Sequence, residues 1–94
     1  MDRGQAEELA VTALAFIGSD ERLLQRFLAI TGIAAGDVRR AAAEPGFLAG
    51  VLQFIAAHEP TLLEFATSAD VRPERIGEAL RALPSGDDGY ERST

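Results

Sequence analysis

Apolar residues recur along this chain at spacings of three and four, in six separate segments. In the first segment, residues 5–17, this spacing places the apolar side chains on one face of an amphipathic helix. No stretch of the chain alternates apolar and polar residues as a half-buried strand would. The pattern therefore predicts an all-α protein. The apolar positions of the first segment are Leu9, Ala10, Ala13, Leu14 and Ile17.

The ends of the first three helices are marked by small and polar residues. Gly18 is a plausible stop for the first helix, and Ser19 or Asp20 is a plausible N-cap for the second. Gly32 then has the position of a left-handed C-terminal residue. A third, shorter helix is predicted over residues 35–44. The second helix carries its apolar stripe on Leu23, Leu24, Phe27, Leu28 and Thr31.

Three prolines punctuate the second half of the chain. Pro45, Pro60 and Pro73 each suit the first turn of a helix, where the missing backbone N–H is not needed. Asp70 stands where Gly32 stood in the first half, and aspartate tolerates a left-handed backbone better than most residues. The inward stripes of these helices are Phe47, Leu48, Val51, Leu52 and Ile55, with Phe54 on the flank; then Leu62, Leu63, Phe65, Ala66 and Ala69; then Ile76, Ala79, Leu80 and Leu83.

The apolar pattern repeats after 38 residues without a gap, as between Phe16 and Phe54. The same shift carries Phe27 onto Phe65. Such a register indicates two copies of one supersecondary unit, each with an apolar face to bury. Because two units are too few for a solenoid, we expect the copies to close on each other. The sequence predicts a compact six-helix bundle built from two tandem three-helix units related by a pseudo-twofold.

Composition narrows the class of protein. The chain has 94 residues, a formal net charge of −6 and no cysteine, which excludes a disulfide framework and a thiolate metal site. We expect a single helical domain over residues 1–84 and a disordered acidic tail over residues 85–94. No apolar run approaches the roughly 18 residues needed to span a bilayer, and no signal peptide is evident. We expect a cytoplasmic protein with no membrane contact.

Several short runs within about residues 6–83 form a recognisable pattern. These runs are Ala13-Leu14-Ala15-Phe16, Arg26-Phe27-Leu28 with Thr31-Gly32, Asp37-Val38-Arg39, Pro45-Gly46-Phe47-Leu48 and Val51-Leu52-Gln53-Phe54. The pattern resembles a family of short alphaproteobacterial proteins known as domain of unknown function 3572. The resemblance implies an all-helical, bacterial and cytoplasmic protein, and it implies no activity and no functional residue.

One segment is similar to a helix-turn-helix, the motif of many DNA-binding proteins. It runs from Phe27 to Ala41 across the turn at Gly32, and residues 65–79 repeat its frame. A DNA-binding helix needs cations on its exposed side. Acidic residues intrude among the cations here and the molecule is negative, so nucleic-acid binding is the alternative hypothesis. The candidate contacts for it are Arg39, Arg40, Arg72 and Arg75.

Catalytic chemistry has little support in the sequence. His58 is the one histidine and precedes Glu59, a pair that could serve as a base with its orienting carboxylate. Adjacent residues in a turn seldom point at one another, and no serine nucleophile completes the set. We expect a solvated or cap-bonding histidine, and a protein that is not an enzyme and that uses no metal or cofactor.

The leading hypothesis for function is a protein–protein interaction or adaptor module. Phe16, Phe54 and Ile30 lie off the main apolar stripes of their helices and are the candidate contact residues. Phe16 and Phe54 are equivalent under the 38-residue shift. Either they fill the seam between the two units, or they form an exposed apolar patch for a partner protein or a homodimer.

Overall fold

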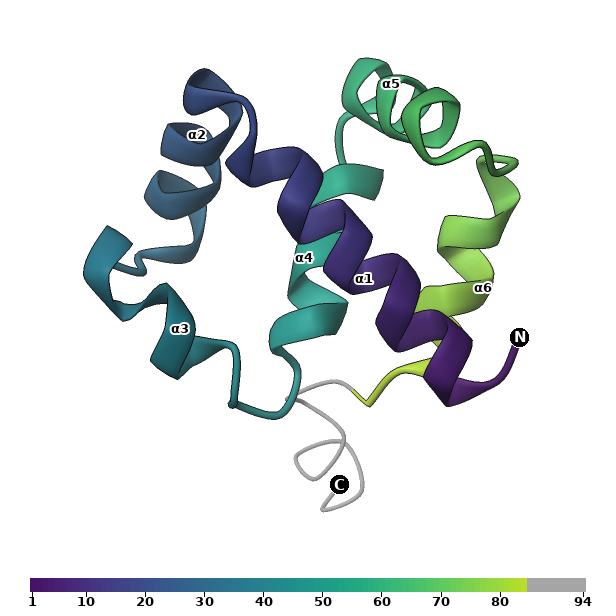
Figure 1. Ribbon diagram of the computed structural model, residues 1–94, viewed down its shortest axis with the longest axis horizontal. Coiled ribbons are helices and arrows are strands. Elements are labelled where there is room, and N and C mark those ends of the chain that lie inside the picture. The colour runs from purple at the N-terminus through teal and green to yellow at the C-terminus, as the bar shows by residue number, and fades with distance from the viewer. Residues whose placement is uncertain (85–94) are drawn as a thin grey trace.

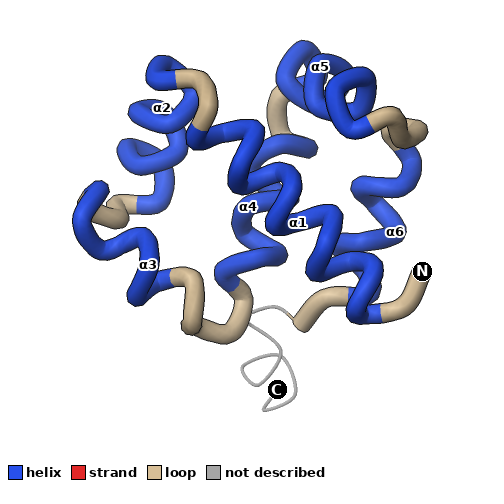
Figure 2. Tube along the Cα trace, in the orientation of Figure 1, coloured by secondary structure: helices blue, strands red, loops and turns tan. Residues whose placement is uncertain are grey.

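The computed structural model describes residues 1–84, which form six α-helices and one short 3₁₀ helix (Figure 1). Figure 2 shows helices and loops, and no strand, in this part of the chain. The all-α prediction is confirmed, whereas the predicted tail of residues 85–94 lies outside the described residues. The helices are α1 (Arg3–Gly18), α2 (Glu21–Thr31), η1 (Ala35–Asp37, 3₁₀), α3 (Val38–Ala41), α4 (Phe47–Ala56), α5 (Glu59–Ala69) and α6 (Glu74–Ala82).

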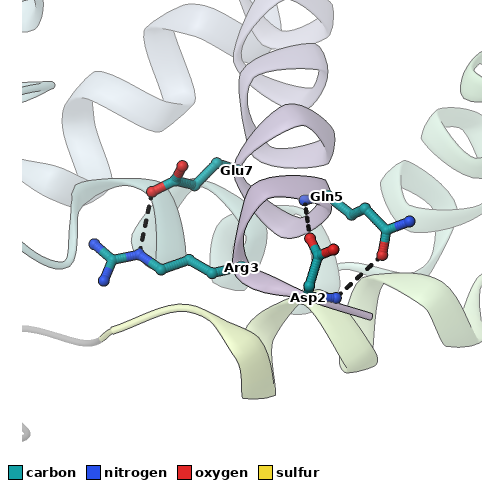
Figure 3. A network of polar contacts seen from close by, with 4 residues as sticks. All are labelled: Asp2, Arg3, Gln5 and Glu7. Carbon is teal, nitrogen blue, oxygen red and sulfur yellow. Dashed lines mark hydrogen bonds and ion pairs between the residues drawn. The ribbon is translucent and has the colours of Figure 1, made fainter.

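Helix α1 begins two residues earlier than predicted because its first turn forms a capping box (Figure 3). The backbone N–H of Gln5 donates to Oδ1 of Asp2 at 2.8 Å. The backbone N–H of Asp2 in turn donates to Oε1 of Gln5 at 3.1 Å. Arg3 and Glu7 add an exposed ion pair of 3.2 Å across the next turn. The two bonds of the capping box satisfy backbone donors that a helix end otherwise leaves open.

The predicted ends of α2 and α5 are confirmed. Oδ1 of Asp20 accepts hydrogen bonds from the backbone N–H groups of Arg22 (3.0 Å) and Leu23 (3.2 Å), so Asp20 is the N-cap of α2. Gly32 ends α2 with a left-handed backbone at φ 76°. Asp70 ends α5 in the same way at φ 57°. Each half of the chain therefore ends its second helix at a left-handed residue.

Replacement of Gly32 by alanine tests this helix end. At φ 76° an L side chain strains the backbone, while the space around the position is open, so strain is the only cost. We expect Gly32→Ala to lower the free energy of unfolding by about 1–2 kcal/mol in urea titrations followed by circular dichroism. Gly36→Ala is the matched control, since Gly36 has open space and no positive φ. Equal stability of the two variants would contradict the assignment.

The third helix is much shorter than the predicted range of residues 35–44. Only η1 and α3 form there, and α3 ends at Ala41. Pro45 disfavours a helical backbone at Glu44, the last residue of the predicted range. Gly46 then turns the chain with φ 88°. The prediction that Pro45 opens the fourth helix is wrong, since α4 begins at Phe47, after that turn.

Helices α1 and α4 form the centre of the fold, with α4 behind α1 in Figure 1. Helix α1 contacts α2, α4, α5 and α6, and α4 contacts α5 and α6 as well. Surrounded in this way, α4 buries not one stripe but most of its circumference, including Ala49 and Phe54. The large side chains that are almost completely buried are Phe27, Phe65, Ile17, Leu52, Ile55, Ile76 and Val51.

Two aromatic contacts join the halves of the chain reciprocally. Phe16 in α1 meets Phe65 in α5 edge-on, with ring centroids 5.4 Å apart. Phe54 in α4 meets Phe27 in α2 edge-on at 5.3 Å. The 38-residue shift exchanges the members of these pairs, so each half inserts a phenylalanine against the second helix of the other half. Edge-to-face pairs add about 0.5–1.5 kcal/mol beyond area burial.

The structure does not confirm the predicted pseudo-twofold as a property of the whole bundle. The contact of α1 with α2 corresponds to that of α4 with α5, but the third helices differ. Helix α6 packs on both α1 and α4, whereas α3 has its principal contact with η1, which directly precedes it. The shortness of α3 explains the difference, because four residues form about one turn and offer no continuous apolar face.

Candidate functional site

Of the three candidate interaction residues, Ile30 lies at the surface and the two phenylalanines do not. Ile30, near the end of α2, is 64% exposed. Phe54 is 9% exposed, and Phe16 is partly buried against the core. With their aromatic contacts to Phe27 and Phe65, Phe54 and Phe16 have the geometry expected of residues that fill the seam between the halves.

Ile30 belongs to an exposed surface of α2 that also carries cations. Arg22, Arg26 and Ile30 are spaced by four residues, so they lie along one side of the helix, and all three are exposed. We call them the α2 face. The guanidinium carbon of Arg26 lies 5.8 Å from the centroid of the Phe54 ring, a distance that suits a cation–π contact. That contact holds Arg26 at the junction of α2 and α4.

A second exposed apolar side chain lies on α5, with acidic neighbours. Leu63 is 47% exposed, and Glu59, Glu64 and Thr67 around it are exposed too. We call these four residues the α5 face. The prediction that Leu63 faces inward is wrong, because two residues on a helix are about 200° apart and Phe65 points into the core. The sequence already implies this angle, but both members of the Leu62-Leu63 pair were assigned to the inward stripe.

Two shallow depressions in the surface adjoin Leu63. One shallow depression of about 520 Å³ lies toward the end of α5 and the turn after it. Another of about 420 Å³ lies along α5 itself, beside Glu64 and Ser68. Leu63 and Thr67 line both depressions. Leu63 therefore lies where two shallow depressions meet, and apolar side chains of a partner could contact it there.

His58 takes part in the local structure at the start of α5. His58 is the N-cap residue of α5, and its Nδ1 lies 2.8 Å from Oγ1 of Thr61. Thr61 is buried, at 6% exposed. Glu59 is exposed and makes no hydrogen bond with His58 among the described contacts. Within residues 1–84, no group of three or more histidine and carboxylate side chains could hold a metal ion.

Two of the four arginines of the helix-turn-helix hypothesis lie on the short helix α3, and the other two lie in α6 and in the turn before it. Arg39 and Arg40 are exposed on α3, a helix of four residues, and Arg40 is paired with Asp37. Arg75 pairs with Glu78 at 2.6 Å, while Arg72 is exposed in the turn before α6. Neither α2 with α3 nor α5 with α6 forms an extensively packed helix pair. The two packed helices that define the motif are therefore not evident here.

Comparison with known proteins gives a family and no activity. A family model described as "Protein of unknown function (DUF3572)" matches residues 3–86. The chain belongs to the DUF3572 family. The match spans all six helices of the DUF3572 fold, including both the α2 and the α5 faces. No curated protein and no solved structure matches it significantly. None of the helices that this chain forms within residues 1–84 is long and apolar enough to cross a membrane.

Proposed function

We propose that this protein is an interaction module that binds another protein through the exposed faces of α2 and α5 and carries out no catalysis. The observation that carries the proposal is the placement of Ile30 and Leu63. Each is a large apolar side chain held in water, at 64% and 47% exposure, on a helix that a buried phenylalanine anchors in the core. Each also lies beside charges of predominantly one sign.

The physical chemistry of the two faces favours binding. Full burial of a leucine or isoleucine side chain stabilises a structure by about 1.5–3 kcal/mol, so a partner that covers these residues gains affinity from them. The flanking charges add specificity and steer the encounter more than they add affinity. A rigid helix face also binds at a lower entropic cost than a loop.

The other two classes of function have less support. An enzyme needs an acid, base or nucleophile directed into a cavity. Here the Nδ1 atom of His58 is already engaged with Thr61. A helix-turn-helix protein needs a recognition helix long enough to enter the major groove, and α3 has four residues.

Replacement of the exposed apolar residues tests the proposal. In affinity capture from a lysate of the source organism, with quantitative mass spectrometry, we expect the Ile30→Ser and Leu63→Ser variants to lose proteins that the wild type retains. Val11→Ser is the matched control, because Val11 is 55% exposed on α1, outside both faces. The same set of proteins bound to all four chains would contradict the proposal.

A further inference from the structure

We propose that the α2 face of one chain binds the α5 face of a second copy of the same chain, with Arg26 of one copy against Glu64 of the other. This inference rests on the proposed function and names the partner that the two faces fit. It makes the protein a self-associating module. Three observations carry it: the signs of the charges on the two faces, their positions on the helices, and the exposed apolar residue that each face contains.

The charges of the two faces are complementary. Residues 41–71, which include all of α4 and α5, contain four carboxylates and no arginine or lysine. The exposed carboxylates beside Leu63 therefore have no cation from their own helix pair. Helix α2 carries Arg22 and Arg26 on its exposed side. Its first-turn acid, Glu21, lies on the opposite side of the helix from Ile30, and Asp20 is engaged as the N-cap. On α5 the negative charge lies at Glu59 and Glu64, whereas the depression at the end of that helix is lined by Arg72 together with Asp70. The opposite signs of the arginines of α2 and the glutamates of α5 favour contact between the two faces.

The positions of the opposing charges correspond. Arg26 and Glu64 are separated by 38 residues, so they occupy the same place in the two halves of the chain, six positions after the N-cap residues Asp20 and His58. Each is exposed and directly precedes a buried phenylalanine, from which it is rotated by about 100° around the helix axis. The same helical position thus presents a cation in one half and an anion in the other.

The groups that would pair are available. The ion pairs of residues 1–84 involve Arg3, Arg40 and Arg75, and none includes Arg22, Arg26, Glu59 or Glu64. Arg26 is held over the Phe54 ring, which reduces the entropy lost when it binds a carboxylate. The shallow depressions beside Leu63 offer room for Ile30 of the second copy and its aliphatic neighbours.

Net charge opposes this association only weakly. Each copy carries a formal charge of −6, which repels a second copy at long range. At physiological ionic strength the Debye length is about 8 Å, so this repulsion is largely screened beyond contact. The pairs at the interface are closer than that length. Two reciprocal contacts between the same two copies make a closed twofold dimer, whereas one contact per pair of copies is heterologous and closes into a ring or extends into an open chain.

Charge exchange between the faces tests the proposal. We expect the wild type to show a mass above the 10.0 kDa monomer in sedimentation equilibrium over a concentration series. Arg26→Glu alone and Glu64→Arg alone place like charges together, so each raises the dissociation constant at least about tenfold. An equimolar mixture of these two variants, and a chain with both changes, should regain the association of the wild type. Arg39→Glu and Glu8→Arg are matched controls on exposed residues outside both faces, and they should associate as the wild type does.

The opposite results overturn the proposal. A wild type that stays monomeric at every concentration would do so, and so would single variants that associate as strongly as the wild type. Failure of the mixture to recover, with both variants folded by circular dichroism, would also overturn it. These failures differ from failure of the proposed function. If the protein is monomeric but capture of another protein depends on Ile30 and Leu63, the interaction module stands and only the self-association is wrong.

Discussion

Phe27→Ala should lower the free energy of unfolding by about 3–5 kcal/mol, a large part of the stability of a domain of this size. Phe27 is 1% exposed, and its ring meets two others edge-on, Phe47 at 6.2 Å and Phe54 at 5.3 Å. Removing it leaves a cavity at the place where α2 joins α4. Urea titration followed by circular dichroism at the helix band measures the loss.

Ile30→Ala is the matched control for Phe27→Ala, since both residues lie on α2 and Ile30 is 64% exposed. The control should change stability by less than about 0.5 kcal/mol, as surface substitutions usually do. If the two variants were equally stable, Phe27 would not be the anchor of α2, and the orientation of the α2 face would lose its support.

Leu52→Asp should prevent folding altogether. Leu52 is 0% exposed in the middle of α4, the helix enclosed by its neighbours. The variant loses a buried side chain and also places an unpaired carboxylate in the core, and an uncompensated buried charge alone costs about 3–5 kcal/mol. We expect a circular dichroism spectrum without helical minima at neutral pH.

Gln53→Asp is the matched control for Leu52→Asp, because it adds the same charge to the same helix at the next, exposed position. This chain should fold with a stability close to that of the wild type. A folded Leu52→Asp protein would mean that α4 has a solvent-facing side at residue 52, contrary to the enclosed position described above.

Local features of the sequence predicted most of the helices and their ends. Cap residues act within one turn of the backbone, so Asp20, Gly32 and Asp70 could be assigned from their types and spacing alone. The length of the third helix could not be predicted in this way, because Ala41, Ala42 and Ala43 favour a helix while Pro45 disfavours one at the residue before it, and spacing alone does not say where the helix stops.

The candidate site was harder to predict from the sequence than the helices were. Ile30 was identified from its position off the apolar stripe, whereas Leu63 was placed inward. A stripe drawn by spacing alone does not say how wide the buried side of a helix is. That width depends on how many neighbours surround the helix: α5 has few, and α4 has enough to bury most of its surface.

The sequence alone determined the helical class, the spacing of the apolar pattern and the residues that begin α2 and end α2 and α5, because these depend on interactions between near neighbours along the chain. The tertiary structure alone decided which half supplies each partner of an aromatic pair, how far α6 and α3 diverge, and which apolar residues stay in water. Those outcomes depend on which helices meet, and packing of surfaces distant in sequence has no local signal that spacing could reveal.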